Sequence, residues 1–220
     1  MNHVRHMNIY TVPAGFSVTL IGAGGIGAAV ALALAKIGVR TLQVFDDDTV
    51  SDENLATQLH EVSENGNFKV DALQRMLEKF SDDIYVMPRP FRVDALSELR
   101  SSLVISAVDN ITARHAIWDA LNNTGSSWDW YLDCRMGAEN FDAFLVPREP
   151  LQMTRYWNLL SKLTDDNVAD LPCTAKSTFY CALMSAGHVG SIVRDIVRAE
   201  AHPMRLVHDI PNHFLQTFPL

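Results

Sequence analysis

The residues most able to do chemistry lie in one glycine-rich segment, Val18-Thr-Leu-Ile-Gly-Ala-Gly-Gly-Ile-Gly27. Gly22, Gly24 and Gly27 fit the spacing G-x-G-x-x-G. In this pattern the first glycine permits a tight turn, the second lets the backbone approach a phosphate, and the third lets the next helix pack closely on the strand. The free N–H groups and the positive dipole end at that helix start attract an anion. The segment therefore predicts a phosphate-binding loop.

An acidic residue at a matching distance extends this prediction from a phosphate to a nucleotide. Asp46 ends an apolar run over Thr41–Phe45. It lies about 20 residues beyond Gly27, the reach at which a carboxylate bonds ribose hydroxyls. The two apolar runs and the alanine-rich pattern between them predict one βαβ nucleotide site. The alternative is a Rossmann-like scaffold that has lost its ligand.

The elements that must position these residues follow from the apolar patterns. Strands are predicted over 18–21, 41–45, 84–87 (ended by Pro88 and Pro90) and 103–108, and helices over 26–37, 68–80, 95–100 (a short piece) and 112–121. Further along, the patterns predict a strand pair over 130–134 and 141–146, a helix over 151–163 and a hairpin over 205–218. They also predict a long helix over 177–199 that is broken or bent near Gly187 and Gly190. The predicted fold class is α/β, a doubly wound Rossmann-like, mostly parallel sheet flanked by helices, with antiparallel strands added in the C-terminal half. Residues 1–220 are expected to form a single domain.

Composition limits the classes of function. The chain has 220 residues, 48% of them hydrophobic, and a net charge of −8, which argues against a dedicated nucleic-acid binder. No apolar run approaches the roughly 18 residues of a membrane span, and the first ten residues do not resemble a signal peptide. The three cysteines form no C-x-x-C pair, so neither a structural zinc nor a disulfide framework is expected. A cytoplasmic protein is the natural interpretation.

Polar groups follow several predicted strands, where an α/β fold carries its chemistry. They are the acidic segment 46–54, Lys69 at the start of a helix, and Asp109 after the fourth strand. A lysine there can reach phosphate oxygens, and aspartates can bind ribose or hold Mg²⁺. Hydride transfer needs a nicotinamide pocket and a proton-transfer residue, and no clear residue of that kind stands out. The set favours phosphate chemistry over a dehydrogenase.

At these residues the chain resembles the ThiF/MoeB/HesA-like superfamily of ubiquitin-activating-enzyme-like adenylyltransferases, from about Val18 to Arg114 and less clearly to about Arg198. Several motifs carry the resemblance in order. They are Gly22-Ala-Gly-Gly-Ile-Gly27 for G-x-G-G-x-G, Asp46-Asp-Asp-Thr-Val for D-x-D-x-V, Asn54-Leu-Ala-Thr-Gln58 for N-L-x-x-Q, Lys69-Val-Asp-Ala for K-V-x-A, and Asp109-Asn110 with Arg114 for D-N-x-x-x-R. Ordered motifs at compatible spacings are much more specific than the glycine loop alone.

The resemblance implies ATP and Mg²⁺, and attack of a partner's C-terminal carboxylate on the α-phosphate to give an acyl-adenylate and pyrophosphate. It implies that Gly22, Gly24 and Gly25 line the phosphates, with Gly27 completing the loop. It also implies that Asp46 and Asp48 hold the nucleotide, Asn54 contacts phosphates, Lys69 neutralises phosphate charge, and Asp109 binds or orients Mg²⁺. The implied partner is a small ubiquitin-like or sulfur-carrier protein with a glycine-terminated tail, and the implied assembly is a homodimer.

Three departures from the family pattern bear on turnover. Thr57 stands where the family usually has arginine, so one phosphate-facing cation is missing. Arg5 is the sole arginine ahead of the glycine loop and poorly matches an arginine that the family often borrows from the other subunit. The family's paired C-x-x-C motifs are absent. Either Arg114 or Arg135 substitutes for the missing cation, or the protein is catalytically impaired.

The segment 148–176 is the predicted crossover region for the partner's tail. Cys173 within it precedes a predicted helix, where the helix dipole activates a thiolate. Some related enzymes carry a thioester-forming cysteine in about this place; the alternative is a buried apolar side chain. Cys134 and Cys181 are expected in the core. Two other functions remain open, an NAD-dependent oxidoreductase and a member that binds nucleotide or a partner without turnover.

Overall fold

A mixed sheet of eight strands organises the chain in the computed structural model, which describes residues 6–166 and 178–219. The strands are β1 Ser17–Ile21, β2 Thr41–Phe45, β3 Tyr85–Arg89, β4 Arg100–Ser106, β5 Ser127–Gly137, β6 Asn140–Pro147, β7 Arg205–Asp209 and β8 Phe214–Phe218. The helices are α1 Gly25–Ile37, α2 Asp52–Leu55, α3 Lys69–Phe80, α4 Ile111–Leu121, α5 Pro150–Leu160 and α6 Phe179–Arg198, with a 3₁₀ turn over Val62–Glu64.

The strand order is β3-β2-β1-β4-β5-β6-β7-β8. The first five strands of this order pair in parallel, and β6, β7 and β8 add to β5 in antiparallel fashion. Parallel neighbours need helical crossovers, whereas antiparallel ones need only turns. The predicted fold class is therefore confirmed, including the change to antiparallel pairing in the C-terminal half.

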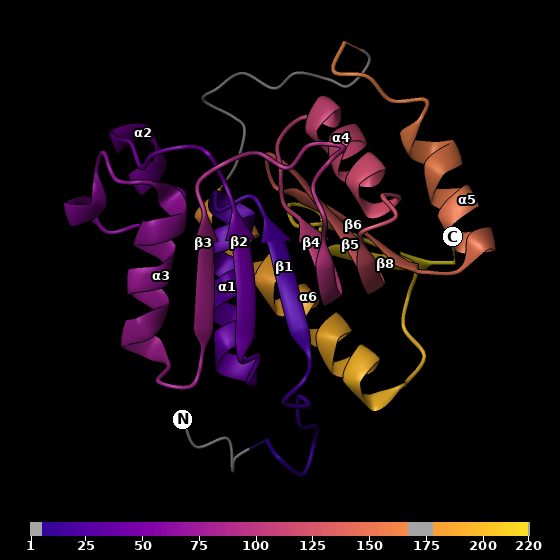
Figure 1. Ribbon diagram of the computed structural model, residues 1–220, viewed down its shortest axis with the longest axis horizontal. Helices are drawn as coiled ribbons and strands as arrows, with labels where there is room; N and C mark the ends of the chain where they lie inside the picture. The colour runs from indigo at the N-terminus through magenta and orange to yellow at the C-terminus, as the bar shows by residue number, and fades with distance from the viewer. Residues whose placement is uncertain (1–5, 167–177, 220) are drawn as a thin grey trace.

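Helices cover both faces of the sheet and bury two separate cores (Figure 1). On one face α1, α3 and α6 pack on the strands through Leu34, Leu73 and Val189 among others. On the other face α4 and α5 pack through Trp118 and Tyr156. The alanine-rich α1 lies against α6 because its small buried side chains allow close approach. No helix among the described residues has the length and apolarity to cross a bilayer.

Several predicted boundaries need correction. The helical piece predicted over 95–100 is wrong, because Asp94 and Ser97 close a turn through their side chains and Arg100 already begins β4. Pro88 lies inside β3, which tolerates a missing N–H because it is an edge strand. The long helix, predicted to be broken or bent near its two glycines, is one unbroken element, α6. The short helix α2 was not predicted.

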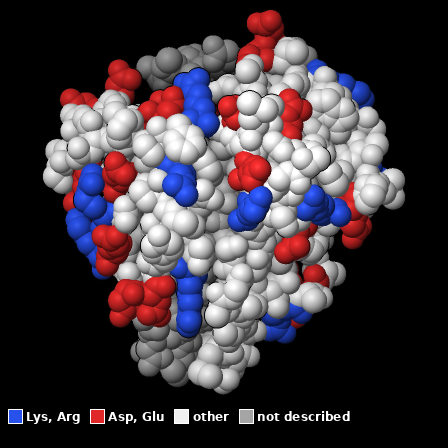
Figure 2. All heavy atoms as spheres, in the orientation of Figure 1, with Lys and Arg blue, Asp and Glu red and all other residues white. Residues whose placement is uncertain are grey.

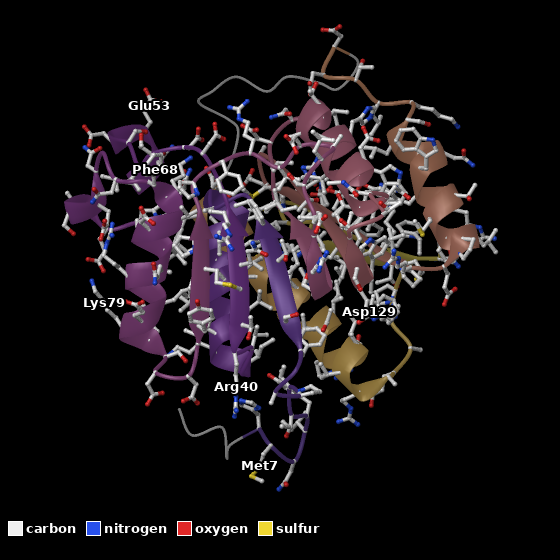
Figure 3. The ribbon with its side chains drawn as sticks, in the orientation of Figure 1. Met7, Arg40, Glu53, Phe68, Lys79 and Asp129 are labelled. Atoms are coloured by element: carbon white, nitrogen blue, oxygen red, sulfur yellow. The ribbon has the colours of Figure 1, made fainter. Side chains whose placement is uncertain are left out.

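The parallel strands bring the chemistry-bearing segments to one edge of the sheet. The glycine loop follows β1, the acidic segment follows β2, and Asp109 follows β4. In Figure 1 the carboxyl ends of β1 and β2 point to the upper edge, where α2 lies. Glu53 and Phe68, labelled in Figure 3, mark α2 and the residue just before α3 near this edge, while Lys79 marks the far part of α3. The fold therefore assembles a candidate site from distant parts of the sequence.

Candidate nucleotide site

The glycine loop has the tight geometry that its sequence predicts. Gly22 has a φ of +101°, and a Cβ on it would lie 2.6 Å from the carbonyl oxygen of Ala107. A Cβ on Gly27 would lie 1.9 Å from the carbonyl oxygen of Gly22. Gly24 and Gly25 are partly exposed, and the nearest described atoms to a Cβ there are at 3.8 and 3.4 Å. The first and last glycines thus serve the fold, while the middle pair leaves room for a ligand.

Helix α1 begins immediately after this loop. Its N-cap is Gly24, which has no side chain to bond the free N–H groups of the first turn. Those groups, with the helix dipole, could hold an anion at the partly exposed part of the loop. At the other end, Gly38 adopts the left-handed conformation and closes the helix, as predicted.

Asp46 ties the acidic segment to the glycine loop. Its Oδ2 accepts a hydrogen bond from the Ala23 N–H at 2.6 Å, and its Oδ1 accepts one from the Asp48 N–H at 2.9 Å. Burial raises the pKa of Asp46, although both backbone bonds act against that rise. Each oxygen keeps a lone pair for a further donor, such as a ribose hydroxyl.

Lys69 supplies a nearly buried cation next to the carboxylate of Asp48. Its Nζ lies 2.9 Å from Oδ2 of Asp48, and its side chain is 8% exposed against 60% for Asp48. The backbone N–H of Lys69 also donates to the Asp48 carbonyl at 2.9 Å. A phosphate oxygen can therefore take the place of Asp48, because that carboxylate can return to water while the lysine stays in position.

Three carboxylates converge at the end of β2. Oxygens of Asp46, Asp47 and Asp48 lie within 4.8 Å of one another, and oxygen ligands of this kind suit Mg²⁺. This group does not include Asp109, the metal ligand that the resemblance implies. Asp109 is exposed, and its Oδ1 accepts from the Asn110 amide at 3.0 Å. The oxygens of Asp46, Asp47 and Asp48 fit a magnesium ion that accompanies a nucleotide, whereas a role of Asp109 toward that ion stays a prediction.

Arg92 is a cation at this site that the sequence analysis missed. Its Nε donates to both oxygens of Asp47 at 2.9 Å, and its side chain is 79% exposed. Asp47 raises the pKa of Arg92 most, and Asp48 and Asp109 add to the rise. Figure 2 shows Lys and Arg side chains interspersed with Asp and Glu side chains on the face it presents. No motif contains Arg92, so its place after the third strand was the sole available signal.

Asn54 and Thr57 lie in and after the short helix α2. The Asn54 Oδ1 accepts from the backbone N–H and the hydroxyl of Ser51 at 3.3 and 3.1 Å, forming a capping box. Its amide NH₂ has no acceptor among the described residues and can serve a phosphate. The Thr57 carbonyl oxygen is the atom 3.4 Å from a Cβ on Gly25. The position where the family usually has arginine therefore adjoins the glycine loop.

The two arginines considered as substitutes are held elsewhere. Arg114 is 5% exposed, pairs with Asp133, and donates to the carbonyls of Val108 and Cys134. The Arg135 Nε donates to Asp133 at 2.7 Å, and its side chain is 20% exposed. To meet a phosphate, the guanidinium of Arg114 has to leave a fully buried carboxylate, and its role toward ATP stays a prediction.

Asp133 is the centre of a buried network that the sequence analysis overlooked. Besides the two arginines, Ser106 and Tyr156 donate to its oxygens at 2.8 Å each. Burial acts to raise the pKa of Asp133, but Arg114 and Arg135 outweigh burial and leave it below its usual value. An acid inside the apolar run 130–134 was the available signal, because a buried charge must be paired.

His60 lies beneath the glycine loop. Its Nε2 is 2.9 Å from the carbonyl oxygen of Ala23, and the residue is 7% exposed. Burial lowers the pKa of His60. Ala23 is thus bonded on both sides, through its N–H to Asp46 and through its carbonyl to His60.

The predicted crossover region 148–176 is described only in part. Helix α5 and the residues up to 166 belong to it, and Asp165 accepts from the backbone N–H groups of Ile111 and Thr112 at 2.6 and 3.2 Å, at the start of α4. Cys173 and Arg5 lie outside the described residues. Cys134 and Cys181 are fully buried, as predicted.

Comparison with known proteins finds a matching family model and related enzymes. A sequence model of the ThiF family matches residues 14–197. The adenylyltransferase and sulfurtransferase MOCS3 of Dictyostelium discoideum is 32% identical over 131 residues, which cover 54% of this chain and 31% of that protein. Ubiquitin-like modifier-activating enzyme 5 of Xenopus laevis is 28% identical over 129 residues, covering 51% and 32%. The aligned part is thus about a third of these relatives' length.

Solved structures agree in fold. E. coli MccB with ATP superimposes with a TM-score of 0.69 at 16% identity, covering 94% of this chain and 64% of that one. PaaA gives a TM-score of 0.69 at 16% identity, covering 91% and 62%. At 16% sequence identity, these two similarities show only that the fold is shared. The family match, however, spans most of the sequence and includes every motif around the glycine loop, so this chain belongs to the ThiF family.

Proposed function

We propose that the protein adenylylates a carboxylate, using ATP and Mg²⁺ to give an acyl-adenylate and pyrophosphate. The observation that carries the proposal is the joint position of three groups at one sheet edge. Asp46 is bonded to the glycine loop, Gly24 and Gly25 at the start of α1 are partly exposed, and the nearly buried Lys69 holds an exchangeable carboxylate. Ribose, phosphate and developing charge each have a matching partner there.

In this reaction the protein has to position the substrate carboxylate and the α-phosphate, and to neutralise the charge on the phosphate oxygens. A carboxylate oxygen of the substrate forms a bond to the α-phosphorus while the bond from that phosphorus to the bridging oxygen breaks, and pyrophosphate leaves with the electron pair. The incoming group is already ionised at neutral pH, so no general base is needed. Lys69 stabilises the negative charge that grows on the phosphate oxygens. Bound Mg²⁺ would add charge neutralisation, with the acidic segment and Asp109 as its candidate ligands.

The proposed substrate is the C-terminal carboxylate of a small ubiquitin-like or sulfur-carrier protein with a glycine-terminated tail. The names of the relatives, a ubiquitin-like modifier-activating enzyme and an adenylyltransferase and sulfurtransferase, support this class. The tail would approach along the region 148–176, and the protein would act in the cytoplasm as a homodimer. A thioester on Cys173 belongs to the same set of predictions.

A catalytically impaired member is the second candidate, and two observations favour it. Thr57 adjoins the glycine loop in place of an arginine, and both candidate replacements bind Asp133. Such a protein would bind ATP without turnover. The NAD-dependent oxidoreductase rests on the glycine loop alone, which the ThiF family shares.

ATP–pyrophosphate exchange tests the proposal, with small carrier proteins ending in Gly-Gly as substrates. Lys69→Ala should abolish exchange, whereas Lys79→Ala should leave it unchanged. Lys79 is the matched control because it lies on the same helix and pairs with Glu61 at 2.5 Å. MgATP binding without exchange for any carrier would favour the impaired member. Tight NAD binding with no ATP binding would reject both candidates.

A further inference from the structure

The ATP site of the proposed function leads to one further assignment. We propose that His60 is a positioning residue for phosphate binding, which holds the peptide between Ala23 and Gly24 so that the Gly24 N–H faces the phosphates. His60 itself touches no nucleotide in this arrangement. It acts through the backbone of the glycine loop.

The contact between His60 and Ala23 has a defined direction. Its two atoms, Nε2 of His60 and the carbonyl oxygen of Ala23, are 2.9 Å apart. A carbonyl oxygen can only accept, so Nε2 carries the hydrogen. With 7% of the residue exposed, water does not compete for this bond. Because burial lowers the pKa of His60, the ring is neutral at pH 7 and still donates.

Peptide geometry transmits this bond to the ligand side of the loop. The described chain has no cis peptide bonds, so the carbonyl of Ala23 and the N–H of Gly24 point in opposite directions across one rigid plane. Holding the carbonyl toward the buried His60 turns the N–H toward the opposite side. Gly24 and Gly25 are the partly exposed residues of the loop, whereas Ala23 and Ile26 are buried. Among the described residues nothing accepts from the Gly24 N–H.

A second bond makes the orientation specific. The Ala23 N–H donates to Asp46 at 2.6 Å, so the neighbouring peptide is fixed by a different side chain. Gly24 has no side chain to hold its own backbone, and as N-cap it makes no side-chain bond. The two contacts therefore orient different peptides of the loop. Asp46 links the loop to the ribose position, and His60 links it to the phosphate position.

Substitutions at His60 separate this role from a general effect on folding. His60→Leu removes the donor, His60→Asn keeps an amide donor too short to reach the carbonyl, and His60→Gln places its amide nitrogen near the former Nε2. His115→Leu is the matched control, because Nε2 of His115, on α4, likewise contacts a backbone carbonyl oxygen, that of Leu160 at the end of α5, at 3.2 Å. Calorimetry with MgATP and ligand-observed NMR with adenosine give the two affinities, and thermal melting reports stability.

The expected result is a selective loss of phosphate affinity. His60→Leu and His60→Asn should weaken MgATP about tenfold, the size of one charge-assisted hydrogen bond, and change adenosine by less than about twofold. His60→Gln should recover most of the MgATP affinity, and His115→Leu should match the wild type. If the leucine variant fails to fold, the asparagine and glutamine pair decides.

Three results would overturn the assignment. One is equal weakening of MgATP and adenosine, which indicates a purely structural histidine. Another is unchanged MgATP affinity in the asparagine variant, and the third is failure of glutamine to rescue. Absence of MgATP binding in the wild type would instead refute the proposed function itself, and this assignment with it.

Discussion

Replacing Asp133 by asparagine should destabilise the protein more than any surface charge change. Asp133 is fully buried and accepts from Arg114, Arg135, Ser106 and Tyr156. An amide keeps the shape of the carboxylate but loses its charge and one acceptor. Arg114, with a side chain only 5% exposed, would then be a buried cation without its counter-ion.

Removing one partner of a buried ion pair costs about 3–5 kcal/mol of unfolding free energy, mainly because the other charge stays buried. For a chain of this size that corresponds to a fall in Tm of about 10 °C. Asp142→Asn is the control. Asp142 also pairs with an arginine, Arg205, but the two side chains are 27% and 40% exposed. A partly exposed pair of this kind contributes at most about 1 kcal/mol.

Urea unfolding followed by tryptophan fluorescence and circular dichroism gives both free energies. The double variant Arg114→Met with Asp133→Leu should recover part of the loss, because it removes both buried charges together. Arg135 can remain, since its partly exposed side chain packs over Phe144 with the guanidinium 4.7 Å from the ring centre. A loss below about 1 kcal/mol for Asp133→Asn would refute the reasoning, because the network would then be dispensable.

Further substitutions test the close packing of the glycine loop, the loss of stability at low pH, and the supply of phosphate-facing cations. Gly27→Ala should lower the free energy of unfolding by at least about 3 kcal/mol, because the new Cβ would lie 1.9 Å from the Gly22 carbonyl oxygen. Gly187→Ala should instead stabilise α6 by about 0.5–1 kcal/mol, because a Cβ there meets nothing within 4 Å. Thermal melting of the two variants measures this difference. The Arg75 bond lowers the pKa of Glu64 to about 2, so its contribution is complete above about pH 4.5 and is lost as pH falls toward 2; Glu64→Gln should remove this part of the acid loss in urea titrations. If a missing cation limits turnover, Thr57→Arg should raise ATP–pyrophosphate exchange by up to about a hundredfold, and an unchanged rate would show that the cation set is already complete.

The sequence predicted the sheet and the glycine loop well because both depend on local patterns. Thr41–Phe45 and the strand pair around Gly137 follow directly from apolar runs between turn residues. Gly22 and Gly27 occupy positions where a side chain would meet backbone atoms, and that constraint is visible in the motif itself. The turn near Asp94 was missed because side-chain bonds to the backbone, rather than periodicity, determine its form.

The contacts within the site were not predictable in this way. The partner of Lys69, the position of Arg92 and the bond from His60 to Ala23 each join residues from different elements, which only the folded sheet brings together. Motif spacing names the residues that reach one sheet edge. It does not say which acid holds which base, and that pairing decides what each cation can do.

The acid with which each cation pairs also determines whether that cation can bind a triphosphate. Lys69 can exchange Asp48 for a phosphate at small cost, because the released carboxylate, already 60% exposed, returns to water. Arg114 has no such exchange, since its departure would leave the fully buried Asp133 without its strongest partner. Arg92 resembles Lys69 in this respect, because Asp47 is 40% exposed. The cations available to a nucleotide are therefore those paired with exposed acids, and the departure at Thr57 has to be offset from that group, not from the buried network.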